Sequence, residues 1–229
     1  MIYKFACCTD THGKPLPDLP QDGISAWLHA GDIYNRGDLK KAHVVPEMKS
    51  IADGIRDIKT PFFLVRGNHD CMDSAGVFSA AHELTGHCNA VAEGIVVVGL
   101  GWTGGQFCDL PTERDMKHVC NSAKREFDFK AMPGDKVILL THYIPWMRNV
   151  FVFNGNPEGW AFECITDLVN EIKPLAIVQG HVHELFGLKA GYRQEEFRSL
   201  IVCPGPKGGI LTIDTESSNV DFKSIEELQ

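Results

Sequence analysis

The sequence has no uninterrupted apolar run that approaches the roughly 18 residues needed to cross a membrane, so we expect no membrane-spanning helix. Its first residues, MIYKFACCTD, lack the long apolar segment of a secretory signal peptide, and we expect a cytoplasmic protein. Basic charge is not in excess either. The net charge of −8 disfavours a long nucleic-acid duplex as the partner, because phosphate backbones are bound by basic faces, but it is compatible with a small phosphorylated substrate.

No C-x-x-C pair occurs, which argues against a structural zinc ribbon. A disulfide framework is also not expected, because the cysteines are scattered and no export signal precedes them. We expect free thiols in a reducing compartment. The cysteines are Cys7, Cys8, Cys71, Cys88, Cys108, Cys120, Cys164 and Cys203.

The chain contains 229 residues, of which 44% are hydrophobic and 23% charged, as in ordinary globular proteins. A chain of this length buries enough surface to fold without disulfides, and we expect one domain over residues 1–229.

Apolar and helical patterns alternate along the chain, which predicts an α/β fold whose functional loops follow the strands. Apolar, β-branched or aromatic runs predict strands at residues 2–9, 26–30, 61–65, 94–100, 136–141 and 175–179. Residues 199–214 predict two more strands joined by a Gly/Pro turn. Helical patterns cover residues 38–56, 112–131 and 160–173; Thr112 is expected to be the N-cap of the second, with Asp115 three residues on.

Polar residues of the metal-ligand type directly follow five of the predicted strands. A single histidine or a single D-x-H segment would be weak support, but five independent strand ends are a joint pattern. The residues are Asp10 and His12, then Asp32, then Asn68, His69 and Asp70, then His142, and finally His181 and His183. Because the carboxyl ends of strands carry functional loops in α/β folds, we expect these side chains to converge.

The mixture of donors indicates a metal pair. In GHVHE (180–184), extended backbone would place the rings of His181 and His183 on one side of the chain. Asp, Asn and His donors without cysteine suit Mn²⁺, Fe, Zn²⁺, Co²⁺ or Ni²⁺. Seven donors exceed the needs of one tetrahedral ion and suit two ions that share a carboxylate and a water. Such a pair can hold the attacking and leaving oxygens of an in-line displacement at phosphorus.

These motifs, taken in order, resemble those of the calcineurin-like metallophosphoesterases. They are D-x-H at 10–12, G-D-x-x-x-x-G at 31–37, G-N-H-D at 67–70, the lone His142 and G-H-x-H at 180–183. The resemblance covers most of the chain and is closest to the compact phosphodiesterase-like branch. It implies a four-layer α/β/β/α sandwich with two mixed sheets and with two metal ions in loops at one edge.

The resemblance also implies a role for each residue. The first metal would be held by Asp10, His12 and His183, the second by Asn68, His142 and His181, and Asp32 would bridge them. His69 would contact phosphoryl oxygens or protonate the leaving group, and Asp70 would accept the other ring N–H of His69. A water between two cations, Mn²⁺ being the first choice, would supply the attacking hydroxide.

The substrate is less constrained. Some members of the compact branch act on cyclic nucleotides or other small diesters, and by analogy we expect a small, nucleotide-like phosphodiester as substrate. The alternatives are a phosphomonoesterase, including a small protein phosphatase, and an inactive scaffold that binds protein partners. Residues 142–160 form either a substrate rim or a loop packed on the core. The residues expected to contact substrate are Arg36, Tyr143, Trp146 and Arg148, whereas Arg66 is expected to pair with a carboxylate.

Overall fold

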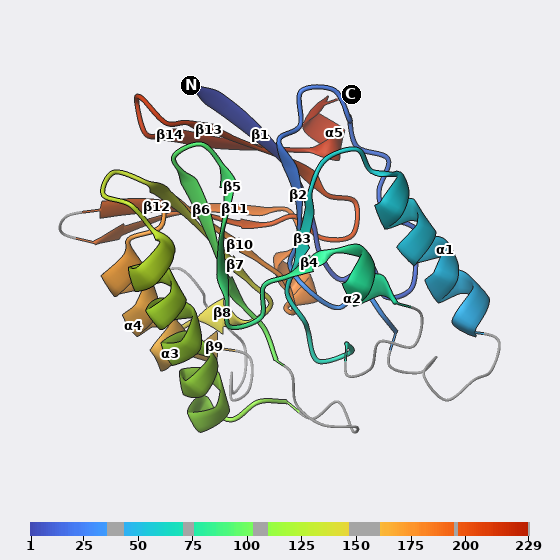
Figure 1. Ribbon diagram of the computed structural model, residues 1–229, viewed down its shortest axis with the longest axis horizontal. Coiled ribbons are helices and arrows are strands. Elements are labelled where there is room, and N and C mark those ends of the chain that lie inside the picture. The colour runs from blue at the N-terminus through green and yellow to red at the C-terminus, as the bar shows by residue number, and fades with distance from the viewer. Residues whose placement is uncertain (36–43, 71–75, 103–109, 147–160, 195–196, 229) are drawn as a thin grey trace.

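The computed structural model describes residues 1–35, 44–70, 76–102, 110–146, 161–194 and 197–228. Two six-stranded sheets face each other, and helices cover the outer face of each (Figure 1). This is the four-layer α/β/β/α sandwich expected from the sequence.

The first sheet has the order β14 (Asn219–Ser224), β13 (Gly209–Asp214), β1 (Ile2–Cys8), β2 (Ala26–His29), β3 (Phe62–Leu64) and β4 (His82–Glu83). Strands β1 to β4 are parallel, whereas β13 pairs antiparallel with both β1 and β14. The carboxyl ends of β1, β2 and β3 therefore meet at one edge of the sheet.

The second sheet has the order β11 (Leu188–Gln194), β12 (Phe197–Cys203), β10 (Ala176–Gln179), β7 (Lys136–Thr141), β6 (Ile95–Leu100) and β5 (Cys88–Ala92). Its four central strands are parallel, and β11 and β5 are antiparallel edges. Strands β8 (Ile144–Pro145) and β9 (Ala161–Phe162) form a small parallel pair beside it.

The helices are α1 (Val44–Asp57), α2 (Val77–Ala80), α3 (Glu113–Lys130), α4 (Glu163–Ile172) and α5 (Ile225–Leu228), with a 3₁₀ turn η1 at His183–Leu185. Helix α3 begins as expected: the Thr112 hydroxyl accepts from the Asp115 amide, and the Asp115 carboxylate accepts from the Thr112 amide. The start of the helix expected over 38–56 lies partly outside the described residues. In the described part of the chain, we find no helix with the length and apolarity that a bilayer crossing requires.

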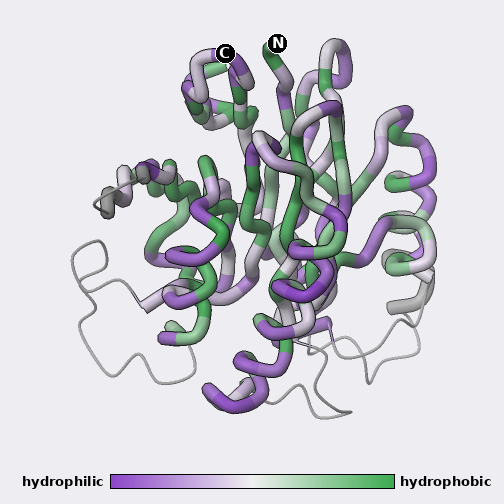
Figure 2. The backbone as a smooth tube through the Cα atoms, turned by 60° about the vertical axis from the view of Figure 1, so that its left-hand side comes forward, coloured by the Kyte–Doolittle hydropathy of each residue, from purple (hydrophilic) through white to green (hydrophobic). Residues whose placement is uncertain are grey.

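Three apolar layers hold the sandwich together. In β7, Ile138 and Leu140 face the other sheet, and Val137 and Leu139 face α3 and α4. A third layer, between the first sheet and α1, contains Trp27. Because the strands are buried on both faces, their sequences are continuous apolar runs. In Figure 2, the hydrophobic residues lie along the central strands, and the hydrophilic residues lie mostly on the outside.

The Gly/Pro turn expected within residues 199–214 is present, but the two strands that it joins are not paired with each other. Residues 199–214 do contain two strands, but β12 pairs with β10 and β11 in the second sheet, whereas β13 pairs with β1 and β14 in the first. The Gly/Pro segment between them passes from one sheet to the other and is not a hairpin turn. The sequence pattern located the strands correctly, but local sequence does not specify a strand's neighbours.

Candidate metal centre

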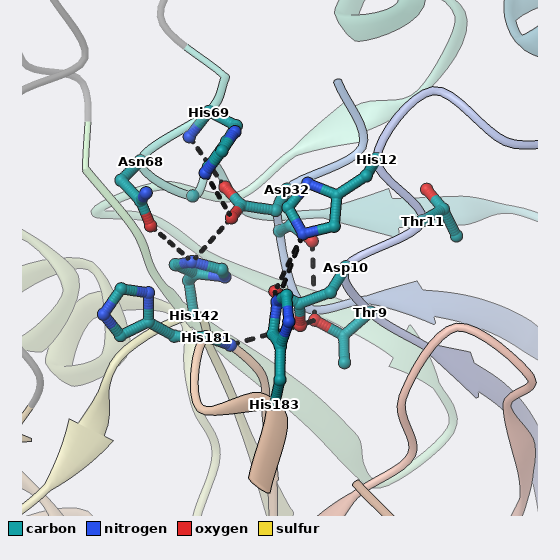
Figure 3. A network of polar contacts seen from close by, with 12 residues as sticks. Thr9, Asp10, Thr11, His12, Asp32, Asn68, His69, His142, His181 and His183 are labelled. Atoms are coloured by element: carbon teal, nitrogen blue, oxygen red, sulfur yellow. Dashed lines mark hydrogen bonds and ion pairs between the residues drawn. The ribbon is translucent and has the colours of Figure 1, made fainter. Parts of the chain in front are cut away.

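Loops from both sheets meet at one edge of the sandwich. The loops after β1, β2 and β3 supply Asp10 and His12, Asp32, and Asn68 and His69, and the loops after β7 and β10 supply His142, His181 and His183. Figure 3 shows most of these side chains, from both sheets, directed at one another, whereas His181 is joined to the others through its backbone amide. All seven residues expected to be metal ligands therefore lie in one network, together with His69.

The backbone is strained at this edge. Six non-glycine residues of the described chain have positive φ, and four of them belong to the site. These are Asp10 (φ 54°), His12 (φ 48°), Asp32 (φ 55°) and His181 (φ 68°). Left-handed backbone is unfavourable for residues with a Cβ, and such strain concentrates at functional sites.

The first cluster contains Asp10, His12 and His183. The Nε2 atoms of the two histidines lie 3.2 Å apart, and Asp10 Oδ1 lies 3.8 Å from His12 Nε2 and 3.4 Å from His183 Nε2. Atoms that each lie ~2.1 Å from one ion are separated by ~3.0–3.4 Å along the edges of an octahedron or tetrahedron. The three donors are thus almost at the spacing of ligands on a common cation.

Hydrogen bonds leave one oxygen of Asp10 open. Its Oδ2 accepts from the Thr9 hydroxyl at 2.7 Å and from the His181 amide at 3.1 Å. Its Oδ1 is buried and has no hydrogen-bond partner. Burial raises the pKa of Asp10, but the contact with His183, the charge of His142 and the Thr9 hydroxyl together outweigh burial, so the net pKa is lowered. A buried, ionised oxygen without a donor is a strong candidate for cation binding.

The second cluster contains Asn68, His142 and Asp32. His142 Nδ1 donates to the carbonyl of Ala30 at 2.8 Å, so its Nε2 faces the site and, once it loses its proton, would be the atom that binds a metal. That Nε2 lies 3.1 Å from Asn68 Oδ1 and 3.5 Å from Asp32 Oδ2. The assignment of the Nδ1 proton follows from the carbonyl, which can only accept.

Asp32 lies between the two clusters. Its Oδ1 accepts from the His69 amide at 2.8 Å, and Asp10, Asp32 and His142 have ligand atoms within 4.8 Å of one another. Burial raises the pKa of Asp32, but the charge of His142 and the contacts with His142 and His69 together outweigh burial, so the net pKa is lowered. Burial lowers the pKa of His142, but the charges of Asp32 and Asp10 together with the contacts to Asp32 and the Ala30 carbonyl outweigh burial and bring the pKa to about 9. The site therefore attracts positive charge.

The two histidines of GHVH lie at the site, but their backbone is not the extended strand that was expected. Strand β10 ends at Gln179, His181 has left-handed backbone, and His183 begins η1. The extended conformation predicted for this segment is therefore wrong. His181 lies beside His142, with ring centroids 5.0 Å apart, whereas His183 lies beside His12. Burial, followed by the charge of His142, lowers the pKa of His181 to about 3 and keeps its ring neutral.

Two glycines allow the loops to approach each other. A Cβ on Gly67 would lie 2.1 Å from Asp32 Oδ1, and a Cβ on Gly180 would lie 2.1 Å from Thr9 Oγ1. Real Cβ contacts are never this short, so side chains at these positions would separate the ligand loops.

The hydrogen bonds described for the Asp70 side chain are with backbone amides. Its carboxylate accepts from the amides of Asp32 (2.7 Å), Gly67 (2.9 Å) and Tyr34 (3.0 Å). These contacts tie the loop after β2 to the loop after β3. Burial, then the charge of Asp32, raise the pKa of Asp70 to about 7. Its expected role as acceptor for the ring of His69 stays a prediction.

His69 lies at the open side of the centre. Its ring packs edge-on against His12, with centroids 4.7 Å apart, and its Nε2 is 3.9 Å from Asp32 Oδ2. It also lines a cavity of about 300 Å³ with Asp32, Asn68 and His181. A phosphoryl group in this cavity would be within reach of the ring, as expected for a histidine that acts on substrate.

The outcome differs among the four residues expected to contact substrate. Tyr143 is fully buried and packs on His142, His181 and Phe162, so the expectation that it stacks on substrate is wrong: its ring supports the ligands from behind. Trp146 is half-buried, and its role stays a prediction. Arg36 and Arg148 lie outside the described residues. Arg66 pairs with both carboxylate oxygens of Glu83, at 2.7 and 2.8 Å, as expected.

Sequence reasoning missed the residues that support the ligands. His29 is fully buried; its Nδ1 accepts from the Gly31 amide, and its Nε2 therefore donates to Thr11 Oγ1, both at 3.2 Å. Burial lowers the pKa of His29 to about 4. Thr9 and Thr11 flank Asp10, and that proximity was the available signal. His29 gave no such signal, because it lies within a segment whose apolar pattern predicts only a strand.

The donor set fits two divalent ions of the borderline class. Each cluster offers imidazole nitrogen with carboxylate or amide oxygen, no cysteine is involved, and the orphaned Asp10 oxygen lies within the first cluster. The residues that would hold one ion are Asp10, His12 and His183; those that would hold the other are Asn68, His142 and His181, with Asp32 between.

Residues 3–185 match the family model of the calcineurin-like phosphoesterases. The chain therefore belongs to this family, whose members are metal-dependent phosphoric ester hydrolases that bind divalent ions.

The individual relatives share little sequence identity with this chain. The UPF0046 protein K07C11.7 of Caenorhabditis elegans is 24% identical over 200 residues, which is 81% of this chain and 65% of that protein. This chain thus spans somewhat less than two thirds of the relative's length. The protein TT1561 of Thermus thermophilus matches with a TM-score of 0.62 at 13% identity, covering 98% of this chain and 99% of that one. A dimetal phosphatase from Danio rerio matches with a TM-score of 0.55 at 11% identity, covering 91% and 92%. At these identities the two structures support the fold.

Proposed function

We propose that the protein hydrolyses a small phosphodiester, with nucleotide-like compounds included, by means of two divalent ions, Mn²⁺ first among them. The observation that carries the proposal is the place of Asp32, whose carboxylate lies between two donor clusters. When bound, such ions neutralise charge on phosphoryl oxygens and make a water acidic enough to attack phosphorus.

The chain's own residues would orient the reaction. Hydrogen bonds fix His142 through Ala30 and fix Asp10 through Thr9, so the ligand atoms are held before substrate arrives. His69, at the open side of the cavity, would donate a hydrogen bond to a phosphoryl oxygen and a proton to the leaving oxygen. In-line attack by water needs no covalent intermediate.

The size and charge of the protein favour a small substrate. The cavity at the ligands has a volume of about 300 Å³, and the chain is acidic, so we propose no long duplex and no membrane as partner. We also propose a cytoplasmic location, supported by the six described cysteines, all buried and free.

Two alternative functions can be distinguished from this proposal by experiment. One is a phosphomonoesterase or small protein phosphatase, which the dimetal phosphatase among the structural neighbours favours. The other is an inactive scaffold, which the complete set of seven ligands disfavours.

The test compares bis(p-nitrophenyl) phosphate with p-nitrophenyl phosphate, using metal-stripped protein to which each divalent ion is returned. We expect Mn²⁺ to support diester hydrolysis in preference to monoester hydrolysis, with two ions per chain. Asp32→Asn keeps the acceptor for the His69 amide but loses the charge, and we expect it to lose bound metal and nearly all turnover. Preference for the monoester would favour a phosphatase. A fully active Asp32→Asn variant would show the bridge assignment to be wrong.

A further inference from the structure

His183 is the most exposed of the seven expected metal ligands. Its side chain is 54% exposed, whereas that of His12 is 20% exposed and that of Asp10 is fully buried. Its Nε2 faces the first cluster, 3.2 Å from His12 Nε2 and 3.4 Å from Asp10 Oδ1. An exposed imidazole loses conformational entropy when it is held in one rotamer, so a ligand at this position needs a contact that orients its ring.

Hydrogen bonding does not supply that contact. A metal-binding histidine is usually oriented by a hydrogen bond from its other ring N–H. His142 follows this pattern, because its Nδ1 donates to the Ala30 carbonyl. In the described part of the chain we find no hydrogen-bond partner for the Nδ1 of His183, and the polar contacts of its ring are made by Nε2. The orientation of this ring therefore depends on a different kind of contact.

The ring of Phe186 makes that contact. The ring centroids of His183 and Phe186 lie 4.8 Å apart, and the planes are stacked at 29°. The local fold explains the stack: His183–Leu185 form the 3₁₀ turn η1, and the Phe186 amide donates to the His183 carbonyl at 3.2 Å. In such a turn, side chains three residues apart lie nearly above one another. The turn thus places Phe186 over His183.

The stack favours a metal-bound imidazole in particular. Imidazole becomes electron-poor when its Nε2 binds a cation, and the electron-rich face of a phenyl ring attracts an electron-poor ring. An aliphatic side chain of similar volume would fill the same space without this attraction. The interaction therefore depends on the aromatic ring of Phe186 and not only on its bulk.

Phe186 is itself held in place by the segment between β12 and β13. Gly205 of this segment packs so closely that a Cβ on it would lie 3.0 Å from Cγ and 3.1 Å from Cβ of Phe186. The carbonyl of Gly205 also accepts from the Thr9 amide at 3.1 Å. The segment that passes from one sheet to the other therefore contacts both the Phe186 ring and the loop after β1.

We propose that Phe186 is a positioning residue of the metal centre. Its ring fixes the orientation of His183, and the segment between β12 and β13 holds Phe186 in place through Gly205. The inference rests on the proposed function for the role of His183 as a ligand, but it does not require that the protein hydrolyse a phosphodiester. Changes at Phe186 should therefore alter one metal site and leave the other unchanged.

The test measures Mn²⁺ binding to metal-stripped protein by calorimetric titration of both sites. Phe186→Ala removes the ring, and we expect one site to bind Mn²⁺ about tenfold more weakly while the other stays within about twofold of the wild type. Phe186→Tyr keeps the stack and should restore the affinity to within about twofold. Phe186→Leu keeps an apolar side chain without a ring, and we expect a loss of at least about fivefold to remain.

Two further variants separate positioning from general damage. Phe127→Ala removes another half-buried phenyl ring, which packs against the apolar layer under α3, and it should lower the melting temperature without changing either Mn²⁺ affinity. In a His183→Ala background, Phe186→Ala should weaken Mn²⁺ binding by less than about twofold more, because its effect passes through His183. Equal affinities for Phe186→Leu and Phe186→Tyr, or an undiminished loss in the His183→Ala background, would overturn the inference.

The same measurements distinguish this inference from the proposed function. Hydrolysis of bis(p-nitrophenyl) phosphate by a protein whose Mn²⁺ affinities are unchanged by Phe186→Ala refutes the positioning role alone. A selective loss at one Mn²⁺ site, in a protein that hydrolyses neither ester, retains the positioning role and refutes the proposed hydrolysis. Absence of Mn²⁺ binding by the wild type refutes both.

Discussion

Gly180→Ala tests whether close packing of two loops builds the metal centre. The added Cβ would lie 2.1 Å from Thr9 Oγ1 and 2.7 Å from Asp10 Oδ2, whereas ordinary Cβ contacts begin near 3.4 Å. Gly180 is not among the residues with positive φ, so the substitution acts through the clash and not through backbone strain. Relief requires a displacement of about 1 Å between the loops after β1 and β10.

That displacement has two measurable effects. Overpacking of a buried site costs about 1–3 kcal/mol of stability, which would appear as a lower melting temperature. Movement of Asp10 and of the His181 amide that it accepts from should weaken Mn²⁺ binding by about 10–100-fold. Calorimetric titration of Mn²⁺ into metal-stripped protein measures the affinity. Gly191→Ala, whose Cβ has open space, should change neither quantity.

A second substitution identifies the clashing atom. Thr9→Ala alone loses the hydrogen bond to Asp10, worth about 1.5–3 kcal/mol for a charged acceptor. In the double variant Thr9→Ala/Gly180→Ala the nearest obstacle is gone, so the combined loss should be smaller than the sum of the single losses. A Gly180→Ala protein with Mn²⁺ affinity within twofold of the wild type, or strict additivity in the double variant, would refute the reasoning.

Three further predictions concern residues around this edge and one helix far from it. His69→Ala should retain both metals and lose about 10²–10⁴-fold in kcat, measured with metal analysis on the same sample; loss of a metal would make His69 a ligand. The buried, neutral His29 has its pKa lowered from 6.5 to about 4. It therefore contributes about 3 kcal/mol of stability that is fully present above pH 6.5 and is lost as the pH falls to and through 4. The unfolding free energy of a His29→Gln variant should fall less steeply than that of the wild type over this pH range. Thr112→Ala removes the cap of α3 and should cost about 1 kcal/mol in urea unfolding while kcat stays unchanged; reduced turnover would indicate coupling that the structure does not show.

The strands and long helices could be read from the sequence because their signals are local. The apolar runs of β1, β6 and β7 are nearly continuous since these strands are buried on both faces. Thr112 and Asp115 indicated the start of α3, because the two residues that form this cap are only three positions apart in the sequence. Short or edge strands such as β4, β9 and β14 were not recognised, because a few residues carry too little periodicity.

The ligands could be named because their residue types and order are unusual, but their geometry could not. Nothing local indicates that Asp10 Oδ2 is occupied by Thr9 and His181 while Oδ1 is left open. The support from His29 and the burial of Tyr143 also depend on elements far apart in the chain. Such facts arise from packing between two sheets, and periodicity along one segment contains no information on them.

The sequence alone determined the α/β class, the metal-binding chemistry and the family, because residue types at strand ends report the chemistry directly. The tertiary structure alone decided which oxygen of each carboxylate faces the centre and that β12 and β13 belong to different sheets. These depend on contacts between residues far apart in the chain, such as Asp10 with His181 and Ile2 with Asp214, and only the folded chain brings such atoms together.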